Sequence, residues 1–144
     1  MRRIKEDVKP AKILEIGTRA VCEEELEYAK EAEVDYLTVH QIRKDGVQKT
    51  IEAISGILEG YEKVYITIDM DVLDPAYVPA VQNPEPEGLD ISTLLDILEH
   101  ICDRRVVGLD LVEVAPHYDK GVTVTQAAKI LFEALCCLEK TRKR

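Results

Sequence analysis

The stretch VYITIDMDVLDP, residues Val64 to Pro75, begins as an apolar run and gains acidic residues toward its end. Alternating β-branched and aromatic residues predict a strand over Val64 to Val72. Asp69 and Asp71 are two residues apart, and side chains at that spacing point to the same side of a strand. The sequence therefore predicts two carboxylates directed into one site near the end of a strand.

Two interpretations of this carboxylate pair remain open. Like charges beside an apolar strand repel each other and lose hydration, so a bound cation would offset the cost. Alternatively, Asp69 and Asp71 are turn or cap residues whose carboxylates accept backbone N–H groups, as we expect of Asp74 before Pro75. The spacing alone does not decide between a metal site and a turn.

Short apolar runs alternate with segments of helical periodicity along the rest of the chain. Besides Val64 to Val72, the predicted strands are Ile13 to Gly17, Tyr36 to Ile42 and Val106 to Ala115. Helices are predicted near Glu24 to Ala32, from Val47 to Leu58, from Ile91 to Cys102, and after a capping box at Thr123 and Gln126. Strands that alternate with helices require parallel pairing through right-handed crossovers. The predicted fold class is α/β, a three-layer α/β/α sandwich with a parallel sheet, in a single domain over residues 1–144.

The composition is that of a folded domain, with 46% hydrophobic and 33% charged residues. A net charge of -9 argues against nucleic-acid and anionic-membrane surfaces and favours a cationic substrate. No apolar run approaches the roughly 18 to 20 residues that span a bilayer, so we expect no membrane partner and a cytoplasmic location. The four cysteines form no CxxC pair, which favours reduced, partly buried thiols over a redox or zinc role.

Three segments carry a resemblance to a known family. Residues 66–89, ITIDMDVLDPAYVPAVQNPEPEGL, resemble the ureohydrolase signature S-x-D-x-D-x-x-D-P and the loop that ends P-E-P-G-G-L in agmatinases. Residues 13–25, ILEIGTRAVCEEE, resemble I-G-x-R-x-x-x-x-E-E, and residues 106–119, VVGLDLVEVAPHYD, resemble G-x-D-x-x-E-V-x-P-x-x-D. The whole chain is thus similar to the C-terminal half of ureohydrolases of the agmatinase and arginase family, and most like agmatinases.

This resemblance implies roles for three residues. Asp69 and Asp71 would be ligands of a binuclear Mn²⁺ site, and Glu113 would accept hydrogen bonds from the guanidinium of the substrate. It also implies hydrolysis by a hydroxide held between the two metals. The P-E-P stretch, Pro84 to Pro86, favours agmatine, which would give putrescine and urea. Carboxylate oxygens suit Mn²⁺ and can pair with a planar guanidinium through two hydrogen bonds.

The sequence also departs from the family pattern. The G-G-D-H and D-A-H-x-D segments that supply the other metal ligands are absent. No histidine replaces them, since one is expected at the end of a strand, one in a helix and one in a turn: His40, His100 and His117. In the loop, Gln82, Asn83 and Glu87 take positions where agmatinases have Gly, Thr and Gly.

The resemblance further implies a sheet with strand order 2-1-3-8-7-4-5-6, to which this chain contributes strands 5 to 8. The strand between 7 and 5 would then be missing, which leaves a gap in the sheet and a bare edge on strand 8. Open edges invite pairing with another chain. We therefore expect a fragment or split half that needs a complementary N-terminal half, or that forms the homo-oligomers common in the family. The alternative is a non-catalytic α/β interaction module or a truncated pseudoenzyme.

Overall fold

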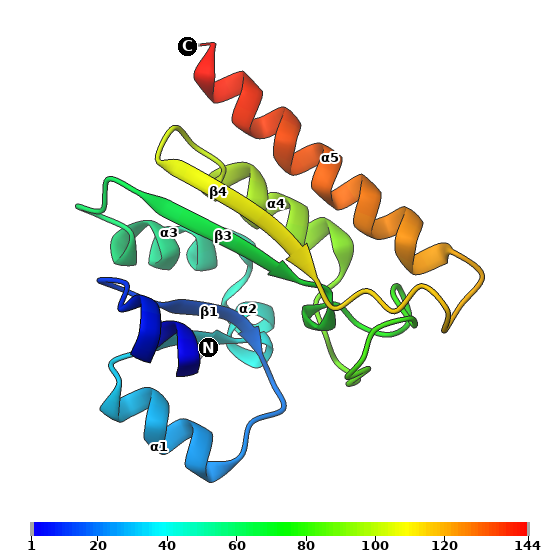
Figure 1. Ribbon diagram of the computed structural model, residues 1–144, viewed down its shortest axis with the longest axis horizontal. Helices are drawn as coiled ribbons and strands as arrows, with labels where there is room; N and C mark the ends of the chain where they lie inside the picture. The colour runs from blue at the N-terminus through cyan, green and yellow to red at the C-terminus, as the bar shows by residue number, and fades with distance from the viewer. Residues whose placement is uncertain (1, 144) are drawn as a thin grey trace.

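The computed structural model describes residues 2–143, in which strands and helices alternate (Figure 1). The strands are β1 (Leu14–Thr18), β2 (Asp35–Thr38), β3 (Val64–Asp69) and β4 (Val106–Val112). The longer helices are α1 (Glu23–Glu31), α2 (Val39–Asp45), α3 (Val47–Ile57), α4 (Ile91–Ile101) and α5 (Val122–Arg142). A π-helix, η1 (Ile4–Val8), precedes β1, and a 3-10 turn, η2 (Met70–Val72), follows β3. The expected α/β class is confirmed.

The strands form two parallel pairs. β1 pairs with β2, and β3 pairs with β4 in a register that places Thr67 opposite Asp110 and Asp69 opposite Val112. Within residues 2–143, β1 and β3 share no hydrogen-bonded ladder. The strand that the resemblance places between them stays a prediction.

The main core lies on one face of the β3–β4 pair. Ile66 and Ile68 of β3 are buried against apolar residues of three helices, including Ile54 of α3, Ile97 of α4 and Ile130 of α5. Figure 1 shows α3 and α4 behind the two strands. Full burial of each such side chain contributes about 1.5–3 kcal/mol to folding.

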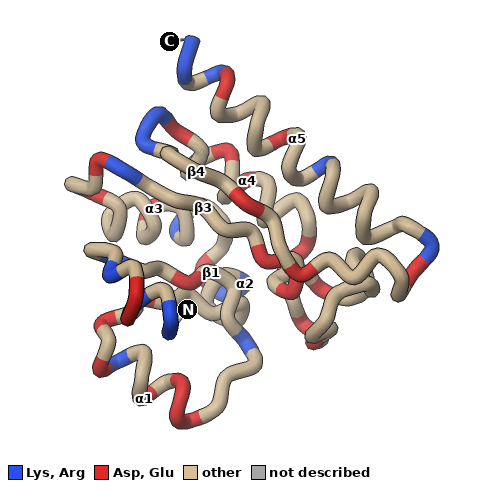
Figure 2. The backbone as a smooth tube through the Cα atoms, viewed as in Figure 1, with Lys and Arg blue, Asp and Glu red and all other residues tan. Residues whose placement is uncertain are grey.

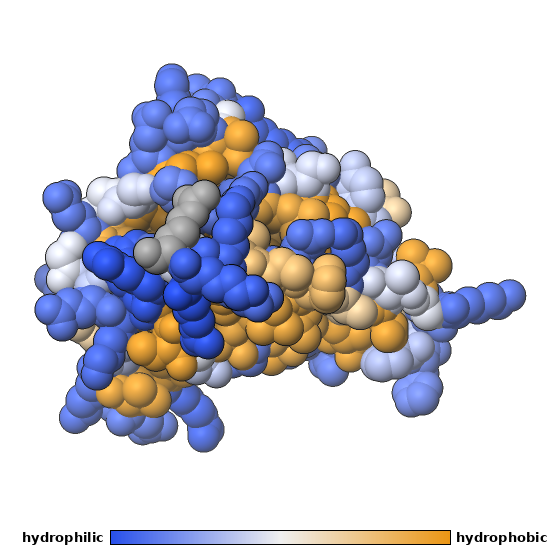
Figure 3. Space-filling view, turned by 90° about the horizontal axis from the view of Figure 1, so that it is seen from above, coloured by the Kyte–Doolittle hydropathy of each residue, from blue (hydrophilic) through white to orange (hydrophobic). Residues whose placement is uncertain are grey.

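The other face of the β3–β4 pair is accessible to solvent. Tyr65 is 62% exposed, and its ring lies over Gly108, where a Cβ would come within 2.4 Å of ring atom Cε2. Its hydroxyl donates to Asp110 Oδ2 at 2.7 Å, and Thr67 Oγ1 donates to Asp110 Oδ1 at 2.6 Å. Seen from above, apolar side chains also remain at the surface (Figure 3). The alternation along β3 therefore separates a buried face from one that residues 2–143 leave open.

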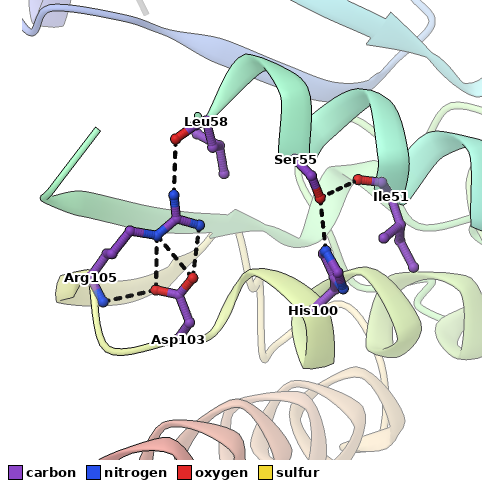
Figure 4. Close-up of polar contacts among 6 residues, drawn as sticks. All are labelled: Ile51, Ser55, Leu58, His100, Asp103 and Arg105. Carbon is purple, nitrogen blue, oxygen red and sulfur yellow. Dashed lines mark hydrogen bonds and ion pairs between the residues drawn. The ribbon is translucent and has the colours of Figure 1, made fainter. Parts of the chain in front are cut away.

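A polar cluster links α3 to the turn between α4 and β4 (Figure 4). Arg105 pairs with Asp103 at 2.7 Å and donates through Nη1 to the Leu58 carbonyl at 2.9 Å. Ser55 Oγ and His100 Nε2 lie 2.8 Å apart. His100 is thus in a helix, as expected, and has a structural partner.

The end of β2 differs from prediction. The strand expected over Tyr36 to Ile42 ends at Thr38, because Thr38 and Gln41 form a capping box that starts α2. Thr38 Oγ1 accepts from Gln41 N at 3.1 Å, and Gln41 Oε1 accepts from Thr38 N at 2.8 Å. His40 therefore lies in α2 rather than at the end of a strand.

The capping box expected at Thr123 and Gln126 is wrong. Helix α5 begins after Gly121, and the Thr123 side chain is buried. Asp119 takes the role of the cap, since its carboxylate accepts from Gly121 N at 2.7 Å and from Thr123 N at 2.9 Å. The strand expected over Val106 to Ala115 likewise ends at Val112.

The four cysteines differ in exposure, with Cys22 and Cys136 exposed and Cys102 buried. All four cysteines are free, and burial raises the pKa of the Cys102 thiol to about 11. Among residues 2–143, no helix combines the length and the apolar character needed to cross a bilayer.

Candidate functional site

Strand β3 ends at Asp69 because the Asp69 side chain accepts a backbone N–H that would otherwise be free to pair in the sheet. Asp69 Oδ1 accepts from Asp71 N at 2.9 Å, which turns the chain into η2. The strand predicted to continue to Val72 is therefore three residues too long. Asp71 lies on a 3-10 turn and not on a strand, so strand alternation does not set the direction of its side chain.

The Asp69 carboxyl lies in a partly desolvated place at this turn. Loss of hydration raises its pKa above the ordinary value. The Asp71 charge acts in the same direction, while the Asp71 N–H and the Arg19 guanidinium oppose it. The neighbouring carboxylates would therefore gain from a cation, and Figure 2 shows several acidic positions where β3 and β4 end.

Asp71 is held by the loop that follows. Asn83 donates through its backbone N to Asp71 Oδ1 at 3.3 Å and through Nδ2 to Asp71 Oδ2 at 3.1 Å. Both carboxylate oxygens thus have a partner from a single residue. The sequence marked Asn83 only as a departure from the family pattern and gave no indication of this contact.

Asp74 fixes the other end of the same loop, as the sequence predicted. Its carboxylate accepts from Ala76 N at 2.9 Å and from Gly88 N at 3.1 Å. These bonds lower the pKa of Asp74, and the bond from Ala76 has the largest effect. A Cβ at Gly88 would lie 2.3 Å from Asp74 N, so the backbones at Gly88 and Asp74 are in direct contact and leave no room for a side chain. Asp74 is therefore a turn residue.

Arg19 is a further residue of the site that the sequence analysis did not single out. It follows β1, and its Nη2 donates to the carbonyl oxygens of Asp71 at 2.6 Å and Glu85 at 2.8 Å. The only signal in the sequence was its place in the I-G-x-R segment.

Glu113 lies at the same sheet edge as Asp69. It directly follows Val112, the register partner of Asp69, and is half-buried with a left-handed φ of 61°. The backbone thus places Glu113 beside the Asp69–Asp71 turn, while convergence of the three carboxylates on one cleft stays a prediction. A cavity of about 490 Å³ in the described chain is lined by Asp74 and by none of the three.

The residues present do not form a complete metal site. Asp69 and Asp71 offer the hard oxygen donors that Mn²⁺ prefers. Within residues 2–143, however, no group of three or more His, Cys, Asp or Glu side chains is arranged to hold an ion. Two carboxylates, one of them bonded to Asn83, supply too few ligands for a binuclear centre.

Comparison with known proteins identifies the family. The sequence profile of the arginase family matches residues 1–137. The chain belongs to the arginase family. Its arginase-like fold is also that of agmatine ureohydrolase of Thermoplasma volcanium, with a TM-score of 0.86 and 37% identity over 99% of this chain and 47% of that one.

Two curated relatives are enzymes with different names. The chain is 35% identical over 129 residues to an agmatinase of Neisseria meningitidis serogroup C, covering 89% of this chain and 40% of that protein. It is 48% identical over 82 residues to a mitochondrial guanidino acid hydrolase of Homo sapiens, covering 56% and 23%. This arginase-family chain therefore spans less than half the length of these relatives. The expected resemblance to ureohydrolases near agmatinase is confirmed.

Proposed function

We propose that this chain is the C-terminal half of an agmatinase-like hydrolase, supplying strands 5 to 8 of the family sheet. Joined to a complementary N-terminal half, it would hydrolyse agmatine to putrescine and urea. The observation that carries the proposal is the parallel register of β3 and β4. It sets Glu113 directly after the partner of Asp69, so the proposed substrate-binding acid and the proposed metal ligands share one edge.

Each acidic residue has a proposed role. Asp69 and Asp71 would be two ligands of a Mn²⁺ site that is complete only when a second segment supplies the rest. Glu113 would accept hydrogen bonds from the guanidinium, whose planar N–H groups match a carboxylate. The net charge of -9 would favour the approach of a cationic substrate.

Agmatine is our preferred substrate, on the strength of the Pro84–Pro86 stretch and of relatives named agmatinase. The relative named guanidino acid hydrolase supports testing a guanidino acid beside it. A guanidino acid carries a carboxylate that agmatine lacks. The acidic chain would repel that carboxylate, so we expect agmatine to be the better substrate.

A second candidate function is that of a non-catalytic interaction module. It is favoured by the incomplete ligand set and by Asn83, which occupies both oxygens of Asp71. On either proposal we expect a cytoplasmic protein that assembles with further chains, since the β1 and β3 edges carry unpaired backbone groups within residues 2–143.

A fusion protein tests the proposal. The N-terminal half of the Thermoplasma volcanium enzyme would be joined to this chain, and the chain alone would serve as the reference. Urea is measured by a colour assay, with agmatine and with guanidinobutyrate, and manganese by elemental analysis. We expect the fusion to bind manganese and release urea from agmatine, and the chain alone to do neither to a measurable extent.

Variants assign the roles within the fusion. Asp71→Ala should remove both manganese and urea release, whereas Glu113→Gln should keep manganese and lose turnover. Asp96→Ala, at an exposed position of α4, is the control and should change neither. Turnover that survives Asp71→Ala would contradict the ligand assignment. A folded fusion that binds no manganese and releases no urea would support the interaction module.

A further inference from the structure

Arg19 connects three segments that are far apart in the sequence. From the end of β1, its Nη2 donates to Asp71 O at 2.6 Å and to Glu85 O at 2.8 Å, and its Nε donates to Glu85 O at 3.2 Å. The carbonyls of Val72 and Leu73 lie 3.4 Å from its Nη1 and Nη2. One guanidinium therefore binds both the η2 turn and the P-E-P turn, which is the segment Pro84 to Pro86.

Close backbone packing brings Arg19 to this position. Gly17, two residues earlier, has a φ of 88°, and a Cβ there would lie 2.3 Å from Cγ2 of Val72 and 3.4 Å from Cδ1 of Leu89. No other residue type would allow β1 to approach η2 this closely. The end of β1 and the η2 turn thus touch, although within residues 2–143 no ladder joins β1 to β3.

The contacts of Arg19 and Asn83 close a ring. Arg19 binds the main chain of Asp71 and of Glu85, and Asn83, two residues before Glu85, binds the carboxylate of Asp71. Movement of the P-E-P turn would therefore pull Asn83 away from Asp71. The orientation of the Asp71 carboxylate depends on the guanidinium although the two do not bond to each other.

We propose that Arg19 is a positioning residue that fixes the Asp71 carboxylate through the P-E-P turn and Asn83. The value of this arrangement for metal binding rests on the function proposed above, whereas the ring itself does not. Lysine cannot replace Arg19 here. Its single ammonium lacks the planar, forked N–H groups that reach several carbonyl oxygens at once.

The first test is made on the unaltered chain. Nuclear magnetic resonance detects the Nε–H proton of Arg19, which the 3.2 Å bond to Glu85 O should protect from exchange with water. We expect exchange at least about tenfold slower than for a free arginine side chain, which is the effect of one hydrogen bond to a charged group. Exchange at the rate of a free arginine would overturn the proposal.

Substitutions then test whether the ring acts as a unit. Arg19→Lys should speed exchange of the Leu89 amide, which donates to Val72 O at 3.0 Å, about tenfold and should shift the signal of the Asn83 side-chain amide. Asn83→Ala breaks the ring at the contact with the Asp71 carboxylate, so it should also speed exchange of the Arg19 Nε–H. Arg105→Lys is the matched control, because Arg105 also binds a carbonyl and should leave both signals unchanged.

The outcomes separate this proposal from the proposed function. A purely structural role would lower the urea midpoint and speed exchange of all amides together, which would overturn positioning. If Arg19→Lys does not fold, the Asn83→Ala result decides. If the substitutions speed local exchange but the fusion neither binds manganese nor releases urea, the ring is retained and the proposed function is rejected. If the substitutions leave local exchange unchanged but the fusion is active, the ring is rejected and the proposed function is retained.

Discussion

The buried hydroxyl of Thr123 offers a direct measure of what holds the loop after β3 against α5. Thr123 is 0% exposed, and its Oγ1 donates to Asp119 Oδ2 at 2.7 Å and accepts from Ala80 N at 2.9 Å. Valine fills nearly the same volume without a hydroxyl. The substitution Thr123→Val would therefore leave the N–H of Ala80, itself a buried residue, without an acceptor.

The expected loss of stability follows from that one orphaned donor. An unsatisfied buried N–H costs about 1–3 kcal/mol, so the free energy of unfolding should fall by that amount. With a urea m-value of about 2 kcal/mol/M, the midpoint of unfolding should fall by about 0.5–1.5 M. Urea titration followed by circular dichroism measures this midpoint, and an unchanged m-value shows that the comparison is valid.

Thr125→Val is the matched control for this experiment. Thr125 lies in the same turn of α5, and its hydroxyl donates to Gly121 O at 2.8 Å, but its side chain is exposed. Both substitutions exchange one β-branched residue for another in a helix, so the change in helix propensity is shared. Thr125→Val should stay within about 0.5 kcal/mol. If Thr123→Val costs no more than Thr125→Val, the hydroxyl does not hold the loop.

Three further predictions use other features of the chain. The hydroxyl of Thr123 and neighbouring backbone N–H groups lower the pKa of Asp119, so its stabilising effect should be full above the ordinary pKa near 3.9 and be lost as the pH falls toward the lower folded value. Asp119→Asn should accordingly be less stable than wild type at pH 7, with a difference that shrinks in acid titrations. Gly17→Ala should cost about 1–3 kcal/mol more than Gly46→Ala in urea titrations, because both need a positive φ but only Gly17 faces Val72 at 2.3 Å. Finally, light scattering over a dilution series should show self-association through the open strand edges, and a monomer at every concentration would contradict this.

The faces of β3 were predictable because alternation is a local property. Ile66 and Ile68 are buried while Tyr65 and Thr67 are exposed, as period-two spacing requires. The end of β3 was not predictable from apolar content, since it depends on a hydrogen bond from the Asp71 N–H to the Asp69 side chain. The same competition between side chain and backbone ended β2 early.

The residues that organise the site were harder to find because their partners are distant or are main-chain atoms. Arg19 binds carbonyls 52 and 66 residues away, and carbonyls leave no mark on the sequence. Asn83 was visible as an unusual residue, but its partner depends on how the P-E-P turn folds back. The cap of α5 was misassigned to Thr123 because Asp119, four residues earlier, accepts the Thr123 N–H that Gln126 would accept in a capping box.

The absence of a shared ladder between β1 and β3 has a consequence for the order in which the chain folds. The pairing of Leu14 with Asp35 closes a loop of 21 residues, whereas that of Val64 with Val106 closes one of 42 residues. Doubling a loop costs only about 0.6 kcal/mol of entropy, so either pair can form without waiting for the other. Once both pairs have formed, Leu14 and Ile16 of β1 pack against the common core and Arg19 binds the η2 turn, so the two pairs should open as one cooperative unit.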